Sequence, residues 1–121
     1  MQALPRVKID PLRQEHLQRV IVVKVGPACY LRGSSTAHFH SQVLDAFRDE
    51  IMSSGHTLKF DALEDVRGGY LELGYDHQGS EHLYAGGKST IFGQMDHDVA
   101  RGLLAEAFPE YSVMILRNLG G

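Results

Sequence analysis

Two histidines flank one phenylalanine in the stretch TAHFHSQVLDAF, residues 36–47. If the chain is extended here, His38 and His40 point to the same side and could share a metal ion. A stable zinc site needs further ligands, and the remaining histidines have no companion spacing such as HxxxH. We therefore expect no metal site and interpret His38 as a solvated loop residue.

His40 stands immediately before a predicted helix that opens at Ser41 or Gln42. The unpaired N–H groups and the positive dipole end of a helix start form a pocket for anions. The same positive potential disfavours imidazolium, so a histidine placed there stays neutral near pH 7 and can accept a proton. A neutral base beside an anion pocket is an arrangement suited to hydrolysis.

A glycine-rich segment, GGKST at residues 86–90, is a second candidate for anion binding. It is not a nucleotide P-loop, because the first glycine of GxxxxGK[ST] would fall at His82. Glycine permits either a tight bend or a close approach of the backbone to phosphate, and we favour the second around Ser89. Arg19 and Asp45 each have a structural explanation beside a functional one. Arg19 fits a strand end that meets water, and Asp45 fits a favourable charge near the helix dipole.

The elements that must hold these residues follow from hydrophobic periodicity. Apolar runs predict strands at residues 19–25, 28–33, 57–62, 70–75, 81–89 and 112–117. Helical spacing predicts one helix over 41–54 and a second that Asp96 caps and Pro109 ends. Gly68-Gly69 is predicted to turn the chain between two strands.

The first and last of the main strands, 19–25 and 112–117, are apolar on both alternating sets, which is typical of strands buried on both faces. The 57–62 strand alternates, with Leu58 and Phe60 facing inward. The element order predicts an α+β fold, a single mixed β-sheet of about six strands with one helix packed on each face. A length of 121 residues fits a single domain over 1–121, in which residues 1–17 form a leading arm.

Composition excludes several classes of partner. Hydrophobic residues make up 43% and charged residues 22% of the chain, the balance of a soluble globular protein. A net charge of −3 without a Lys/Arg-rich tract argues against a nucleic-acid partner. The start of the chain lacks the apolar core of a signal peptide, and no apolar run approaches membrane-spanning length, so we expect a cytoplasmic protein without a membrane partner. The lone Cys29 fits a reducing compartment.

The residues around His40 resemble a segment of the Janus/phosphohistidine phosphatase family. In RGSSTAHFHSQVLD, Arg32-Gly33 is followed seven residues on by His40, and Asp45 stands five further along, as in that family. GGKSTIFGQMDH (86–97) and FPEYSV (108–113) are similar to further family segments, and RVIVVKV looks like its first core strand. The similarity covers roughly residues 19–115, and several pieces in the right order are hard to assemble by chance.

The resemblance implies a metal-independent, cofactor-free hydrolase: a protein phosphatase that cleaves the N–P bond of phosphohistidine. It implies that His40 is the general base that activates water, with transient phosphorylation of His40 as the less favoured route. It also implies that Ser41, Ser89 and Ile91 hold the phosphate, largely through backbone N–H groups, and that Arg19 contributes charge. The partner would be a phosphohistidine-containing protein, and we expect the chain itself to be a monomer.

Two departures from the family pattern bear on substrate binding. The family commonly carries an arginine directly after its glycine pair, whereas Tyr70 stands there in this chain and Arg67 or Lys88 would have to substitute. Phe39 replaces the usual tyrosine. The missing arginine supports an alternative, a non-enzymatic regulator that binds phosphate or phosphoproteins with the same anion pocket, and turnover distinguishes the two.

Overall fold

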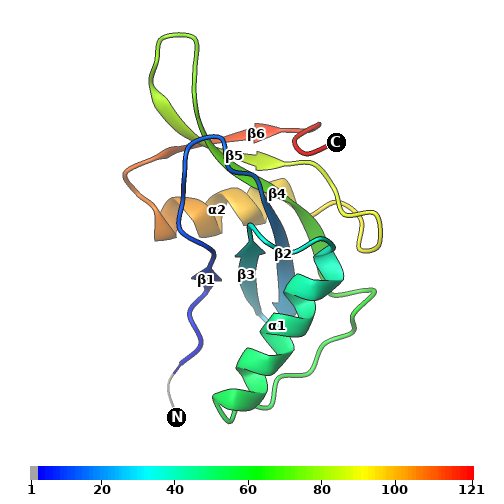
Figure 1. The fold of residues 1–121 in the computed structure, drawn as a ribbon. Helices are drawn as coiled ribbons and strands as arrows, with labels where there is room; N and C mark the ends of the chain where they lie inside the picture. Colours follow the sequence, from blue (N-terminus) through cyan, green and yellow to red (C-terminus); the bar gives the residue numbers. More distant parts are fainter. Residues whose placement is uncertain (1–2) are drawn as a thin grey trace.

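The computed structural model describes residues 3–121 (Figure 1). These residues form two helices and six strands. In chain order they are β1 (Val7–Lys8), β2 (Gln18–Val25), β3 (Ala28–Ser34), α1 (His40–Ser53), β4 (Val66–Tyr75), β5 (Glu81–Gly86), α2 (His97–Ala107) and β6 (Ser112–Leu116). Neither helix has the length and apolar character that crossing a bilayer requires, as far as residues 3–121 are concerned.

The six strands form one sheet in the order β1-β3-β2-β4-β5-β6. The four central strands pair antiparallel, while the outer pairs β1–β3 and β5–β6 are parallel. The sheet is therefore mixed, and the predicted α+β fold is confirmed. Within the leading arm, β1 pairs with β3, and the amide of Leu31 donates to the carbonyl of Arg6.

β2 is buried on both faces, as predicted, and it separates two cores. Val20 and Val22 pack with Ala100 and Leu104 of α2. Ile21 and Val23 lie on the other face, in the core that α1 completes. Successive strand residues point to opposite faces, so each helix covers one side of the sheet, as expected and as Figure 1 shows.

The prediction of a strand over residues 57–62 is wrong. The segment is irregular, although Leu58 and Phe60 still pack against the α1 core, so its alternating pattern reflects real burial. Side-chain hydrogen bonds begin at its end: Asp65 accepts from the amide of Asp61, and Asp61 accepts from the amides of Leu63 and Glu64, which follow the segment. Such local bonds from aspartate compete with sheet formation.

The predicted turn at Gly68-Gly69 is also wrong, because both glycines lie inside β4, paired with β2. A Cβ added to Gly68 would lie 2.7 Å from the Cβ of Ser89 and 2.9 Å from Cδ2 of His40. A Cβ on Gly69 would lie 2.6 Å from the carbonyl oxygen of Gly86. These glycines are needed because other parts of the chain approach the strand closely on both faces.

The last strand is not buried on both faces, contrary to the prediction. Within the described residues β6 pairs with β5 alone, so it forms an edge of the sheet. Val113 and Ile115 pack against the α2 core, whereas Met114 and Leu116 are 45% and 42% exposed. The reason is the position of α1, which packs on β2 and β3 and leaves the same face of β6 uncovered.

Candidate functional site

A pocket of about 430 Å³ opens where the start of α1 meets the sheet. Four separate segments line it: the start of β2, residues 38–41, the middle of β4 and residues 89–91. All of the site residues predicted from the sequence are among its lining residues: Arg19, His40, Ser41, Ser89 and Ile91. The structure thus brings together side chains that are up to 72 positions apart in the chain, from Arg19 to Ile91.

The geometry of the α1 start follows from Phe39 and Gln42. Phe39 is the N-cap, with an extended backbone (φ −140°, ψ 148°), so the helix begins at His40, one residue earlier than predicted. Gln42 Oε1 accepts from the amides of His38 (2.7 Å) and Phe39 (3.1 Å), which fixes the entry of the chain into the helix. The amide of Ser41 has no acceptor within residues 3–121, and it lines the pocket. A free N–H at a helix start is a donor for an anion.

His40 is held in place by β4. Its side chain is only 5% exposed, and Nε2 lies 2.7 Å from the carbonyl oxygen of Gly69. A carbonyl can only accept, so Nε2 carries the hydrogen and Nδ1 carries the lone pair of the neutral ring. Across the part of the chain that the structure describes, Nδ1 has no hydrogen-bond partner. The ring of Tyr70 stands edge-on to the imidazole, with 5.1 Å between centroids and 82° between planes.

The electrostatic surroundings keep His40 neutral. Burial lowers the pKa of His40, the hydrogen bond to the Gly69 carbonyl opposes that shift, and the charge of Arg19 lowers the pKa further. The net result is a pKa below the ordinary histidine value. The expected neutrality thus rests on burial and Arg19, whereas the sequence argument relied on the helix dipole.

Residues 89–93 form a tight turn beside His40. The amide of Ser89 donates to the carbonyl of Gly93 (3.2 Å), and the amide of Gly93 donates back to the carbonyl of Ser89 (2.9 Å). Ser89 Oγ accepts from the amide of Phe92 (3.1 Å), so its hydroxyl hydrogen is the group left to donate. The amides of Thr90 and Ile91 have no acceptor within the described chain, and both residues line the pocket.

Arg19 supplies the positive charge of the pocket. Its Nη1 donates to the carbonyl of Ala37 (2.7 Å), and its guanidinium lies 5.8 Å from the centre of the Tyr70 ring. No lysine or other arginine lines the pocket in the described structure. Arg67 does not replace the missing family arginine, because its Nη1 donates to the carbonyls of Leu63 and Val66.

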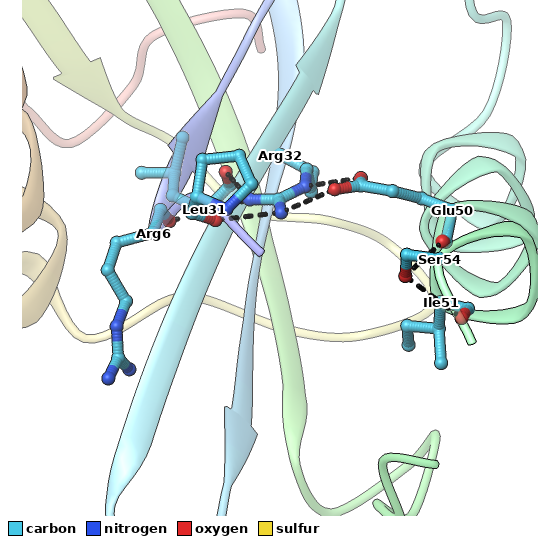
Figure 2. Close-up of polar contacts among 7 residues, drawn as sticks. Arg6, Leu31, Arg32, Glu50, Ile51 and Ser54 are labelled. Carbon is cyan, nitrogen blue, oxygen red and sulfur yellow. Dashed lines mark hydrogen bonds and ion pairs between the residues drawn. The ribbon is translucent and has the colours of Figure 1, made fainter. Parts of the chain in front are cut away.

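Away from this pocket, an ion pair between buried Arg32 of β3 and partly buried Glu50 fixes α1 against the sheet (Figure 2). Arg32, 4% exposed, donates from Nε and Nη2 to the two carboxylate oxygens of Glu50, at 2.8 and 2.9 Å. Arg32 also donates to the carbonyl of Pro5 (2.8 Å), which ties the leading arm to the same point. The Arg-Gly of the family motif is therefore a structural feature here, because Arg32 anchors the helix that begins at His40.

Sequence reasoning missed Gly68 as a site residue, and it named Tyr70 only as the residue that stands in place of the family arginine. Gly68 leaves room for Ser89 and His40 beside β4, and Tyr70 lines the pocket between His40 and Arg19. Apolar residues on both sides of the glycine pair, Val66 before and Leu71 after it, fit a strand that continues through the glycines. Asp45 is exposed and does not line the pocket.

The histidines do not form part of a metal-ligand cluster. Within residues 3–121 there is no group of three or more His, Cys, Asp or Glu side chains that could hold a metal ion. His38 is exposed at the rim of the pocket, while His40 is buried with Nε2 bonded to the backbone.

The family of the chain is shown by comparison of its sequence with models of protein families. The sequence model of the Janus/Ocnus family matches residues 1–112. The chain belongs to the Janus/Ocnus family, and the resemblance predicted from the sequence is confirmed at that level. A search of curated proteins finds no match.

Proposed function

We propose that this protein is a metal-independent phosphohistidine phosphatase in which His40 is the general base. The observation that carries the proposal is the environment of His40: a neutral imidazole whose Nδ1 is unpaired, in one pocket with Arg19, Ser41 and the 89–91 segment. A base of this kind must reach a water molecule next to an electrophile that backbone donors hold in place.

The reaction balances without a further reagent. The oxygen of a water molecule attacks phosphorus, so an O–P bond forms while the P–N bond to the substrate imidazole breaks. One proton of the water stays on the phosphate, and His40 Nδ1 accepts the other and passes it to the leaving imidazole. The products are hydrogen phosphate and a neutral histidine, and His40 returns to its starting tautomer.

The donors around His40 are suited to the charge of a phosphoryl group. The amides of Ser41, Thr90 and Ile91 and the hydroxyl of Ser89 are available, and Arg19 adds a full positive charge. Phosphoryl transfer depends mainly on alignment of the nucleophile and stabilisation of equatorial oxygen charge. In this assignment Ser89 contributes its hydroxyl, because its own amide is bonded to Gly93.

The test is release of inorganic phosphate from a phosphohistidine peptide in the presence of EDTA. His40→Ala should lower kcat by about 10³-fold or more, because a positioned base contributes about 10²–10⁴-fold. His38→Ala is the matched control, since His38 lines the same pocket but is exposed. Circular dichroism must accompany the assay, because His40 is buried and its removal leaves the Gly69 carbonyl unpaired. A folded His40→Ala variant with the wild-type rate refutes the assignment.

One observation favours the alternative of a non-enzymatic phosphate-binding regulator. Arg19 is the only permanent cation in the described lining of the pocket, and Nη1 of Arg19 is already bonded to the Ala37 carbonyl. Weak charge stabilisation lowers rate more than it lowers binding. Saturable binding of the phosphohistidine peptide without accumulation of phosphate would favour the regulator.

A further inference from the structure

Two large apolar side chains are exposed at the pocket that holds His40. Phe39, the N-cap of α1, is 66% exposed, and Ile91, in the 89–93 turn, is 59% exposed. Both residues line the pocket, and neither belongs to the two cores of the sheet. Single exposed apolar residues are ordinary on a protein surface, but two at one pocket indicate that a ligand covers them.

The pocket also lacks a carboxylate. Among its described lining residues there is no aspartate or glutamate, while Arg19 places a positive charge there. At neutral pH, N-phosphorylated lysine and arginine keep a cationic nitrogen group next to the phosphoryl group. Arg19 repels such a group, and no negative side chain in the lining offsets the repulsion.

A phosphorylated imidazole differs from both in charge and in shape. In its unprotonated form the ring is neutral and flat, so it presents apolar area without adding a like charge beside Arg19. Flat rings pack favourably on aromatic and branched aliphatic side chains. The aromatic face of Phe39 and the branched side chain of Ile91 are of this kind.

We propose that Phe39 and Ile91, named here the apolar rim, hold the imidazole ring of the substrate and thereby select phosphohistidine over phospholysine and phosphoarginine. This inference rests on the proposed function of the same pocket. The phosphoryl group lies against the start of α1 and the 89–93 turn, and the ring extends from it to the apolar rim. The rim takes no part in proton transfer, so it acts on substrate choice alone.

The test compares three substrates: a phosphohistidine peptide, a phospholysine peptide of the same sequence, and phosphoramidate, which has an N–P bond but no ring. Wild type should prefer the phosphohistidine peptide. Phe39→Ala should lower kcat/KM for that peptide by about tenfold, the range that loss of one apolar contact region produces. The same variant should leave kcat/KM for phosphoramidate within about twofold of wild type, because the phosphate donors and His40 are unchanged.

Further variants separate the rim from other effects. Phe39→Tyr keeps the flat ring and should retain the wild-type preference. Ile91→Ala removes the branched side chain and should also lower kcat/KM for the phosphohistidine peptide. Met52→Ala is the control for removal of an exposed apolar side chain, because Met52 is 77% exposed and lines a different pocket.

The outcomes distinguish failure of the apolar rim from failure of the proposed phosphatase activity. If wild type hydrolyses phosphoramidate and the phosphohistidine peptide but Phe39→Ala treats both as wild type does, the apolar rim is refuted and the phosphatase remains. Equal rates on the phospholysine and phosphohistidine peptides refute the selectivity. If wild type hydrolyses none of the three, the proposed function fails, and the inference fails with it.

Discussion

Nε2 of His40 lies 2.7 Å from the carbonyl oxygen of Gly69, so a residue in the middle of β4 sets the tautomer of the first residue of α1. The hydrogen is on Nε2 and the basic lone pair is on Nδ1. The edge-on ring of Tyr70 restricts the imidazole further. Pairing between β4 and β2, and packing of α1 on β2, are thus the parts of the fold that orient the candidate base.

The first prediction concerns pH. Burial and the charge of Arg19 lower the pKa of His40 against the opposing hydrogen bond to Gly69. The neutral ring is the active form, so kcat/KM for phosphate release should rise with pH through a midpoint below 6.5, the ordinary histidine pKa. The same pKa should appear when the imidazole C–H signals of the free protein are followed by NMR. An acidic limb centred clearly above that value contradicts His40 as the base.

The second prediction isolates the contribution of Arg19. Arg19→Gln removes a positive charge that lowers the pKa of His40, so this pKa should rise and the acidic limb should move to higher pH. NMR titration of the free protein measures the shift independently of substrate binding. Arg48→Gln is the control, because Arg48 lies over the ring of Phe60 and lines another pocket. An unchanged His40 pKa in Arg19→Gln means that the two side chains are not coupled.

The third prediction concerns Gly68. A methyl group there would lie within 3 Å of Ser89 Cβ and His40 Cδ2, at 2.7 and 2.9 Å, so Gly68→Ala should displace the 89–93 turn from α1. We expect a loss of about 1–3 kcal/mol in the free energy of unfolding, the usual cost of overpacking, together with lower kcat/KM. Urea unfolding and the phosphate assay measure the two effects.

Gly102 provides the matched control for that substitution. It is an exposed residue of α2, and nothing lies within 4 Å of an added Cβ. Gly102→Ala should therefore raise the free energy of unfolding by about 0.5–1 kcal/mol through helix propensity, without changing the rate. If Gly68→Ala behaves as Gly102→Ala does, the close packing of β4 against His40 and Ser89 is not essential.

The sequence predicted both helices and most of the sheet because their apolar patterns are local. Asp96 was predicted to cap α2, and its Oδ1 accepts from the amides of Asp98 (2.9 Å) and Val99 (3.1 Å). The errors concern features that depend on distant partners. The 57–62 segment has the periodicity of a strand, but no strand of residues 3–121 pairs with it, and one face of β6 is exposed because α1 covers β2 and β3 instead.

The residues of the site were also predicted only in part. The spacing around His40 and Ser89 pointed to the residues that now line one pocket, because a family resemblance carries information about distant contacts. Tyr70 was named only as the residue in place of the family arginine, and its position in the middle of β4 was missed because Gly68-Gly69 was interpreted as a turn. A glycine pair does not reveal from sequence alone whether it bends the chain or admits a close neighbour.

The fourth prediction concerns Tyr70, which stands where the family commonly has an arginine. Among the described residues that line the pocket, Arg19 is the only lysine or arginine. Tyr70→Arg would add a second cation there. Inorganic phosphate should then inhibit at about three- to tenfold lower concentration, as one added charge-assisted hydrogen bond implies. The pKa of His40 should fall further, because the new charge repels imidazolium. Inhibition at the wild-type phosphate concentration would mean that position 70 does not reach the anion.

The fifth prediction concerns the ion pair that anchors α1 (Figure 2). Burial raises the pKa of Glu50, but the hydrogen bond and the charge of Arg32 outweigh burial, so the net pKa is lowered. A lowered carboxylate pKa contributes stability above the unfolded value that is lost as pH falls through the folded value. Glu50→Gln should therefore unfold at lower urea concentration at pH 7 and lose less of its remaining stability in acid than wild type does.

A double variant decides whether the pair stabilises the protein or only avoids an isolated charge. Glu50→Gln leaves the guanidinium of Arg32 buried without a counter-charge, which should cost about 3 kcal/mol. Arg32→Met combined with Glu50→Leu removes both charges, and apolar replacements of buried pairs are often neutral, so the double variant should regain most of that loss. Because α1 then remains docked with His40 at its start, the phosphate-release rate of the double variant should stay close to wild type. A double variant as unstable as Glu50→Gln would instead mean that the bonds of Arg32 to the leading arm, including the carbonyl of Pro5, carry the stability.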